Sequence, residues 1–205
     1  MRVLLFASLL LLSWALSGCG TTRAPQRYLS HFDLKQPQID DFETCASIGC
    51  RKRSQLAYSE AEWQSLQAIF QAPASSAAEE RQRLLLAIAA METMIGAKNG
   101  TSVDQAKNQR NGHTSRQLDC IAETANTTVA LLLLEQAELI RYHRVSYPQH
   151  RGFANLCFPH NTAVVCELES GAHFAIDSWF FANGEPPICV PVEQWKAGYA
   201  PPTAN

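Results

Sequence analysis

The 205-residue sequence predicts an α+β fold in which helices come first and an antiparallel sheet follows. Apolar residues recur at helical spacing in three segments between residues 59 and 138. From residue 139 onward, β-rich segments alternate with turn residues, and no internal repeat is visible. Helices followed by strands, rather than alternating with them, are typical of α+β domains.

Two helices are predicted in the first half of the chain. The first covers about residues 59–71, with Ser59 as its N-cap and Glu62 as the capping-box partner. The second begins after Ser76 and stops near "KNG" at 98–100, where glycine favours a C-cap. The apolar stripes of both helices predict packing against a core rather than a ligand site.

A third helix is predicted from about residue 120 to residue 138. It is apolar on every side from Val129 to Leu134, which indicates a fully buried position. A polar loop at 101–118 precedes it, and loops of this length in compact domains are often functional. The loop delivers the chain directly to Cys120 in the first turn of this helix.

Strands are predicted at 139–147, 161–168 and 173–180, with a short one near 188–192. The middle two flank "ESGA" and form a hairpin. If 168–171 is its loop, His160 faces Trp179, and Asp177 lies on the same face two residues along, roughly 7 Å away at Cβ. A two-residue loop at 170–171 would separate His160 and Asp177 by four residues, roughly 13 Å, which is too far for a hydrogen bond.

The N-terminus predicts export and lipid anchoring. Arg2 precedes an apolar run to about Leu16, which is too short for a spanning helix and has the form of a signal peptide. The run ends in "LSGC" at 16–19, which resembles the lipobox of bacterial lipoproteins, whose cysteine is acylated after cleavage. The alternatives are an ordinary signal peptide or an uncleaved anchor.

The lipobox resemblance implies a signal peptide at 1–18, a lipidated tether at 19–44 and a folded domain at 45–205. The partner would be the lipid bilayer, reached through acylated Cys19. Gly20, in place of aspartate, favours the outer membrane of the cell envelope, facing the periplasm. The net charge of −2 and a single short basic cluster give no support for nucleic-acid binding.

Seven cysteines in an exported chain predict disulfides. Cys45 and Cys50 bracket a short turn-like loop and are the best candidates for a bridge. With Cys19 lipidated and Cys120 free, five cysteines remain, so at least one more is unpaired. The sequence has no CxxC pair and no HExxH, so neither a metal site nor a cofactor is predicted.

Cys120 is the candidate nucleophile. The first turn of a helix has unsatisfied N–H groups that favour an anion, and helix N-termini stabilise thiolates. The neighbouring carboxylate of Asp119 opposes this effect unless it points away and caps the helix. An isolated cysteine in an apolar helix is otherwise a small buried residue, which is the structural alternative.

A nucleophilic cysteine needs a base, and six histidines are available. His160 opens the first hairpin strand and shares a face with Asp177, which would orient its ring. His113, in the polar loop close to Cys120, is a second candidate base. The remaining histidines lie in the tether, beside the first strand and by the hairpin turn: His31, His143, His150 and His173.

A cysteine at the start of a buried helix, a histidine opening a strand and an aspartate on the next strand resemble the transglutaminase-like superfamily. The resemblance is greatest to the bacterial transglutaminase-like cysteine peptidases, on Asp119-Cys120 and on "AIDSW" around Asp177. It covers about residues 115–182, little more than a third of the chain. It implies a transglutaminase-like (papain-like) fold with the cysteine-bearing helix packed on the sheet.

By this resemblance, Cys120 attacks an amide or ester carbonyl, His160 takes its proton and later protonates the leaving amine, and Asp177 orients the imidazole. The backbone N–H of Cys120 and the side chain of Gln117 would stabilise the oxyanion. A protein or peptide in the periplasm is the implied substrate.

The chain also departs from this family. Ile121 and Ala122 stand where members of the peptidase group often carry acidic residues that help to bind calcium, so no calcium is predicted. Thr162 replaces an aromatic residue two positions after the histidine, which affects substrate contacts more than the triad. A catalytically inactive lipoprotein that serves as a binding or scaffold module is the alternative function. A structural lipoprotein with Cys120 in a disulfide is a third.

Overall fold

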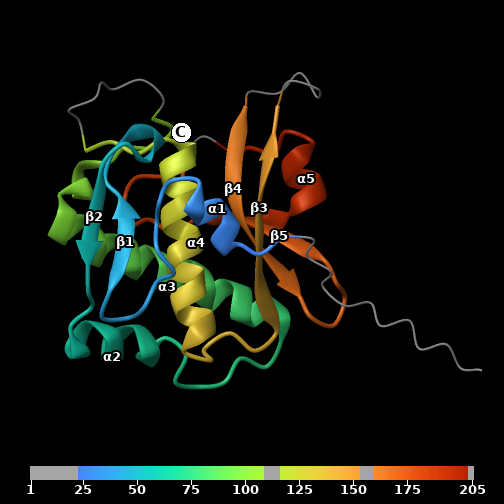
Figure 1. Cartoon of the computed structure of the whole chain (residues 1–205). Helices are drawn as coiled ribbons and strands as arrows, with labels where there is room; N and C mark the ends of the chain where they lie inside the picture. Colours follow the sequence, from blue (N-terminus) through green and yellow to red (C-terminus); the bar gives the residue numbers. More distant parts are fainter. Residues whose placement is uncertain (1–22, 109–115, 153–158, 203–205) are drawn as a thin grey trace, which may run out of the picture.

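One central helix, α4 (Cys120–Gln136), organises the computed structural model, which describes residues 23–108, 116–152 and 159–202. Figure 1 shows α4 between a two-stranded sheet and a four-stranded sheet. Both sheets are antiparallel, so the predicted α+β class is confirmed. The small sheet pairs β1 (Phe42–Cys45) with β2 (Arg53–Leu56), and the large one has the order β3 (His143–Arg151), β4 (His160–Glu167), β5 (His173–Asp177) and β6 (Ile188–Pro191).

The two predicted N-terminal helices are present with their caps. α2 (Glu60–Ala68) begins with the Ser59–Glu62 capping box, in which each residue binds the backbone N–H of the other. In α3 (Ala77–Asn99), the Ser76 side chain caps the first turn, and Gly100 ends the helix at a φ of 82°, where glycine has no steric penalty. Capping side chains therefore set the helix starts as the sequence predicted.

Helix α4 is buried along most of its length, as its uniform apolarity predicted. Every residue from Ala122 to Leu134 is buried. The helix ends where Glu138 adopts a φ of 57° and the Leu139 N–H donates to the Leu134 carbonyl at 3.0 Å. Leu139 and Ile140 thus belong to the helix end rather than to a strand. The strand predicted at 139–147 is therefore displaced and lies at His143–Arg151.

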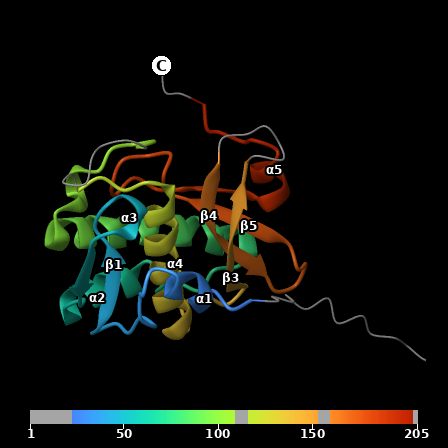
Figure 2. The same ribbon diagram turned by 45° about the horizontal axis from the view of Figure 1, so that its top comes forward.

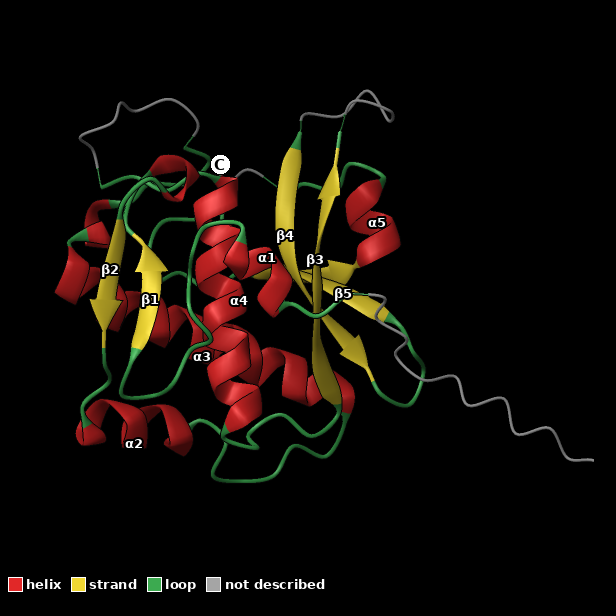
Figure 3. Ribbon diagram, in the orientation of Figure 1, coloured by secondary structure: helices red, strands yellow, loops and turns green. Residues whose placement is uncertain are grey.

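The four-stranded sheet has a hydrophobic core on each face. Figures 2 and 3 show α4 on one side of this sheet and α5 (Val192–Lys196) on the other. Ala163 and Val165 of β4 join the α4 core, whereas Val164 between them joins a second core with Trp195 of α5. β5 ends at Asp177, earlier than the predicted 180, because residues 178–181 form a turn closed by Phe181 N–H and the Ser178 carbonyl. The predicted hairpin and short final strand are otherwise confirmed.

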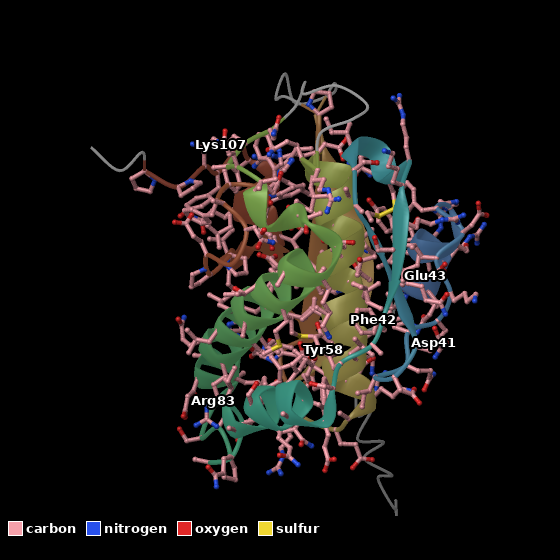
Figure 4. All side chains as sticks on the ribbon, turned by 90° about the vertical axis from the view of Figure 1, so that its left-hand side faces the viewer. Asp41, Phe42, Glu43, Tyr58, Arg83 and Lys107 are labelled. Carbon is pink, nitrogen blue, oxygen red and sulfur yellow. A yellow bond between two sulfur atoms is a disulfide. The ribbon has the colours of Figure 1, made fainter. Side chains whose placement is uncertain are left out.

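The predicted tether at 19–44 is too long, because its described part is folded onto the domain. α1 (Gln26–Ser30) packs beside α4, and Tyr28, Leu29 and Leu34 are buried. Phe42 of β1 stacks on Tyr58 with ring centroids 4.9 Å apart, whereas Asp41 and Glu43 lie on the outer side of the strand (Figure 4). Buried aromatic and aliphatic residues thus begin well before residue 45. Cys19 lies outside the described residues.

Candidate active site

Asp119 caps the N-terminus of α4 through its side chain. Its Oδ1 accepts hydrogen bonds from the Ala122 N–H at 3.0 Å and from the Gly49 N–H at 2.9 Å. The aspartate therefore occupies the capping position that its place before Cys120 allowed. Cys120 itself is a free thiol of intermediate exposure in the first turn. Its backbone N–H has no acceptor within the helix, as is general for first-turn N–H groups.

The Cys45–Cys50 loop lies against the start of α4. Cys45 and Cys50 form a disulfide, and the short helix η1 (Ile48–Cys50) lies within this loop. The Asn126 side chain accepts from the Cys45 N–H at 2.7 Å and donates to the Cys45 carbonyl at 3.0 Å. With the Gly49–Asp119 hydrogen bond, these contacts fix the first two turns of α4 to the small sheet.

Two other cysteines complete the count in the described residues. Cys166 is also disulfide-bonded, and Cys189 is free. The expectation that at least one cysteine besides Cys120 is unpaired agrees with this finding.

The β4–β5 hairpin has the register that the wider loop predicted. Ala163 pairs with Ile176 and Cys166 pairs with His173, which leaves residues 168–171 in the turn. In this register, His160 Nε2 lies 2.7 Å from Asp177 Oδ2, and both residues are at most 3% exposed. A strand start and a strand end thus present an imidazole and a carboxylate to each other.

Aromatic rings enclose the His160 imidazole. The ring centroids of Trp179, Phe180 and Trp195 lie 4.5, 5.5 and 5.5 Å from that of His160. The Trp179 indole N–H donates to the Asn108 carbonyl at 3.0 Å, so it ties the polar loop before α4 to the segment after Asp177. Cys120 packs against this same aromatic cluster, which brings the helix start to the histidine.

The charges around His160 favour its protonated form. Burial alone would lower its pKa, but the hydrogen bond to Asp177 and the interaction with Cys120 outweigh burial and raise the pKa to about 9. Nε2 binds Asp177, and Nδ1 is buried with no hydrogen-bond partner among the described residues. Nδ1 is therefore the ring nitrogen that remains available, and it belongs to the same imidazole that interacts with the Cys120 thiol.

Asn161 is a site residue that the sequence analysis missed. Its Nδ2 lies 3.9 Å from Cys120 Sγ. Because neighbouring residues in a strand point to opposite faces, the predicted position of His160 did not imply that Asn161 also lies near Cys120. The sequence signal that could have indicated Asn161 was an amide side chain next to the candidate base His160.

Gln117 has other contacts than those predicted. Its Oε1 accepts from the Gln105 N–H at 3.0 Å and from the Asn108 side chain, and its Nε2 donates to the Val103 carbonyl at 2.6 Å. The polar loop therefore engages both ends of this amide, and no contact with Cys120 is described. Gln117 has these partners because backbone groups of the loop need hydrogen-bond partners in a buried position.

The other candidate histidines are not brought to Cys120. His113 lies outside the described residues. His31 and His150 are exposed, and His173 lies beside the hairpin turn at the start of β5. His143 is buried in a separate network with Glu80. Within the described residues, His160 alone joins Cys120 and an aspartate.

Comparison with known proteins adds no relative. No protein-family model, no curated protein and no solved structure matches the chain. None of the helices within residues 23–108, 116–152 and 159–202 is long and apolar enough to cross a membrane.

Three more carboxyl groups are buried next to the site: Glu92 of α3, Asp104 of the polar loop and Glu123 of α4. Burial, followed by the Asp104 charge, raises the pKa of Glu92 to about 7, and burial with the Asp119 charge raises that of Asp104 to about 6. The pKa of Glu123 is raised well above its ordinary value by burial and then by Glu92 and Asp104. In the described part of the chain, no group of His, Cys, Asp or Glu side chains has the geometry of a metal site.

Proposed function

We propose that this chain is a cysteine peptidase or amidase with a transglutaminase-like (papain-like) fold. The observation that carries the proposal is His160, whose Nε2 binds Asp177 at 2.7 Å while the same ring interacts with the free thiol of Cys120. Nucleophile, base and orienting acid come from α4, β4 and β5. The acyl group would come from a protein or peptide.

The proposed reaction uses the two ring nitrogens in different roles. Nδ1 takes the proton of Cys120, and the thiolate attacks the substrate carbonyl to form a tetrahedral intermediate. Protonated His160 then gives that proton to the leaving amine, and an acyl-cysteine remains. Water attacks the acyl group with His160 as base, which regenerates the thiol, while a second amine in place of water would give amide transfer. Throughout, Asp177 keeps Nε2 in place and stabilises the imidazolium.

Asn161 replaces Gln117 as the proposed side-chain donor to the oxyanion. Its amide already contacts Cys120 Sγ, and the oxyanion forms on the carbon atom that becomes bonded to that sulfur. The backbone N–H of Cys120, in the first turn of α4, would supply the second donor at the positive end of the helix.

Lipid anchoring of this enzyme is part of the proposal and has its own test. Expression in a bacterium with a labelled fatty acid is expected to label the wild-type chain and not Cys19→Ser. Unlabelled wild type would remove the anchor and the outer-membrane location from the proposal, and would leave the catalytic part standing.

The main experiment measures the reactivity of Cys120 in the purified full chain. Limiting iodoacetamide is added from pH 5 to pH 10, and modified sites are mapped by mass spectrometry. Cys189 is an internal control, because burial raises the pKa of its thiol to about 12. Selective labelling of Cys120 at neutral pH, lost in His160→Ala, is expected. If Cys120 reacts no faster than Cys189, or reacts equally without His160, the catalytic proposal is wrong.

A non-catalytic binding module is the second candidate, and one observation favours it. A cavity of about 430 Å³ opens between β3, the hairpin turn and α5, lined by residues that include Gln149, His173 and Lys196. None of its lining residues belongs to the proposed triad. An inert Cys120 in the labelling experiment would direct attention to this cavity.

A further inference from the structure

Asp177 Oδ2 accepts a second hydrogen bond that the triad does not include. The indole Nε1–H of Trp195 donates to this oxygen at 2.8 Å, while His160 Nε2 lies 2.7 Å from the same atom. Trp195 is fully buried, and Asp177 is 2% exposed. Two buried side chains therefore bind the same carboxylate oxygen and orient it.

The position of the Trp195 ring is itself fixed. It lies on α5 and faces the His160 ring at 5.5 Å, tilted by 34°. The Arg151 guanidinium lies over the Trp195 ring, 4.6 Å from the ring centroid. Arg151 also donates to the carbonyls of Trp195 and Tyr199, and it is the β3 partner of His160 in the sheet. The strand that flanks His160 therefore holds the helix that carries Trp195.

We propose that Trp195 is a positioning residue of the site, whose indole N–H holds the Asp177 carboxylate in the orientation that His160 requires. This inference rests on the proposed function, because it assigns Trp195 a role in the same acyl-transfer site. An indole N–H can only donate, so Trp195 cannot take the proton of Nε2 and can only orient its acceptor. The short C-terminal helix α5 is thereby part of the active site.

The test removes the N–H and keeps an aromatic ring. Trp195→Phe is compared with Trp179→Phe, a matched control, since Trp179 also packs on His160 but donates to Asn108 instead of Asp177. The His160 titration is followed by NMR of the imidazole, and Cys120 alkylation by iodoacetamide is measured in the same samples. Trp195→Phe is expected to lower the His160 pKa by about one unit, because a loosened Asp177 no longer offsets burial. Alkylation at pH 7 should slow about tenfold, whereas Trp179→Phe, which leaves both contacts of Asp177 Oδ2 in place, should not lower the titration midpoint.

The outcomes separate this inference from the proposed function. An unchanged or raised His160 pKa in Trp195→Phe, with Cys120 reactivity still lost in His160→Ala, would overturn the role of Trp195 alone. If the reactivity of Cys120 does not depend on His160, both the role of Trp195 and the proposed function are wrong. If Trp195→Phe does not fold, the wild-type chain supplies the measurement. The Trp195 indole proton should then exchange slowly and shift with the His160 titration, and an indole proton that ignores this titration would contradict the inference.

Discussion

The described part of the molecule contains two buried histidine–carboxylate pairs, and only one of them is a candidate for catalysis. His143 Nδ1 lies 2.8 Å from Glu80 Oε1, and His160 Nε2 lies 2.7 Å from Asp177 Oδ2. Each of these histidines is 3% exposed. Distance and burial therefore do not distinguish the two pairs.

The second ring nitrogen distinguishes them. His143 Nε2 accepts from the Arg81 guanidinium at 3.0 Å, and Arg81 in turn binds Glu167 at 2.5 Å, so this ring has both nitrogens occupied. His160 Nδ1 has no hydrogen-bond partner in the described residues, and its ring interacts with a free thiol. A fully paired ring stabilises a fold, whereas a ring with an unused nitrogen beside a nucleophile can move a proton.

The largest expected difference between the pairs is in Cys120 reactivity. His160→Ala removes the base, and alkylation of Cys120 at pH 7 should fall on the order of a hundredfold. His143→Gln is the matched variant and should leave the alkylation rate of folded molecules unchanged. Rates measured by quenched mass spectrometry test both. Equal losses in the two variants would show that both histidines act through the fold, and the comparison would fail.

The loss of stability should be larger for a variant of the Glu80–His143 pair than for His160→Ala. Glu80→Ala leaves His143 Nδ1 without its buried partner and removes the acceptor for the N–H groups of Arg141 and Tyr142. A loss of about 3 kcal/mol in the free energy of unfolding is expected. Denaturant titration measures it, with Cys120 alkylation in native buffer as the control. A loss below that of His160→Ala would contradict a structural role for the Glu80 pair.

The sequence predicted the His160 pair and not the His143 pair, for a physical reason. Hairpin register follows from turn length within one short segment, so His160 and Asp177 could be related by counting residues. Glu80 and His143 are 63 residues apart on α3 and β3, and only the packing of helix on sheet brings them together. Gln117 was misassigned for the same reason, since its partners Val103 and Gln105 lie in a loop without periodicity. Asn161 was missed because its contact depends on how the end of β4 meets α4.

A smaller effect is expected in the pH dependence of stability, which should distinguish His160 of the active site from the buried carboxyl group of Glu92. The folded-state pKa of Glu92, about 7, exceeds its ordinary 4.5, so its contribution is present below pH 4.5 and is lost as the pH rises through 7. The His160 contribution is present below its ordinary pKa of 6.5 and is lost as the pH rises through about 9. Glu92→Gln should flatten the stability profile in the lower window only, and His160→Ala in the upper window only. Chemical denaturation across pH 4 to 10 checks this, and changes in exchanged windows would contradict the assignment.

The smallest expected effect concerns Asp119 at the start of α4, which caps the helix and precedes Cys120. Asp119→Ala removes the cap on Ala122 and the acceptor for Gly49, and should cost about 1 kcal/mol of unfolding free energy. Asp119→Asn keeps a capping oxygen without the negative charge beside Cys120, so it should restore most of this stability and speed Cys120 alkylation. If the asparagine variant instead slows alkylation while it restores stability, the charge of Asp119 supports the thiolate site rather than opposing it. Capping and electrostatics at this residue are thereby separated, because only one of them depends on the charge.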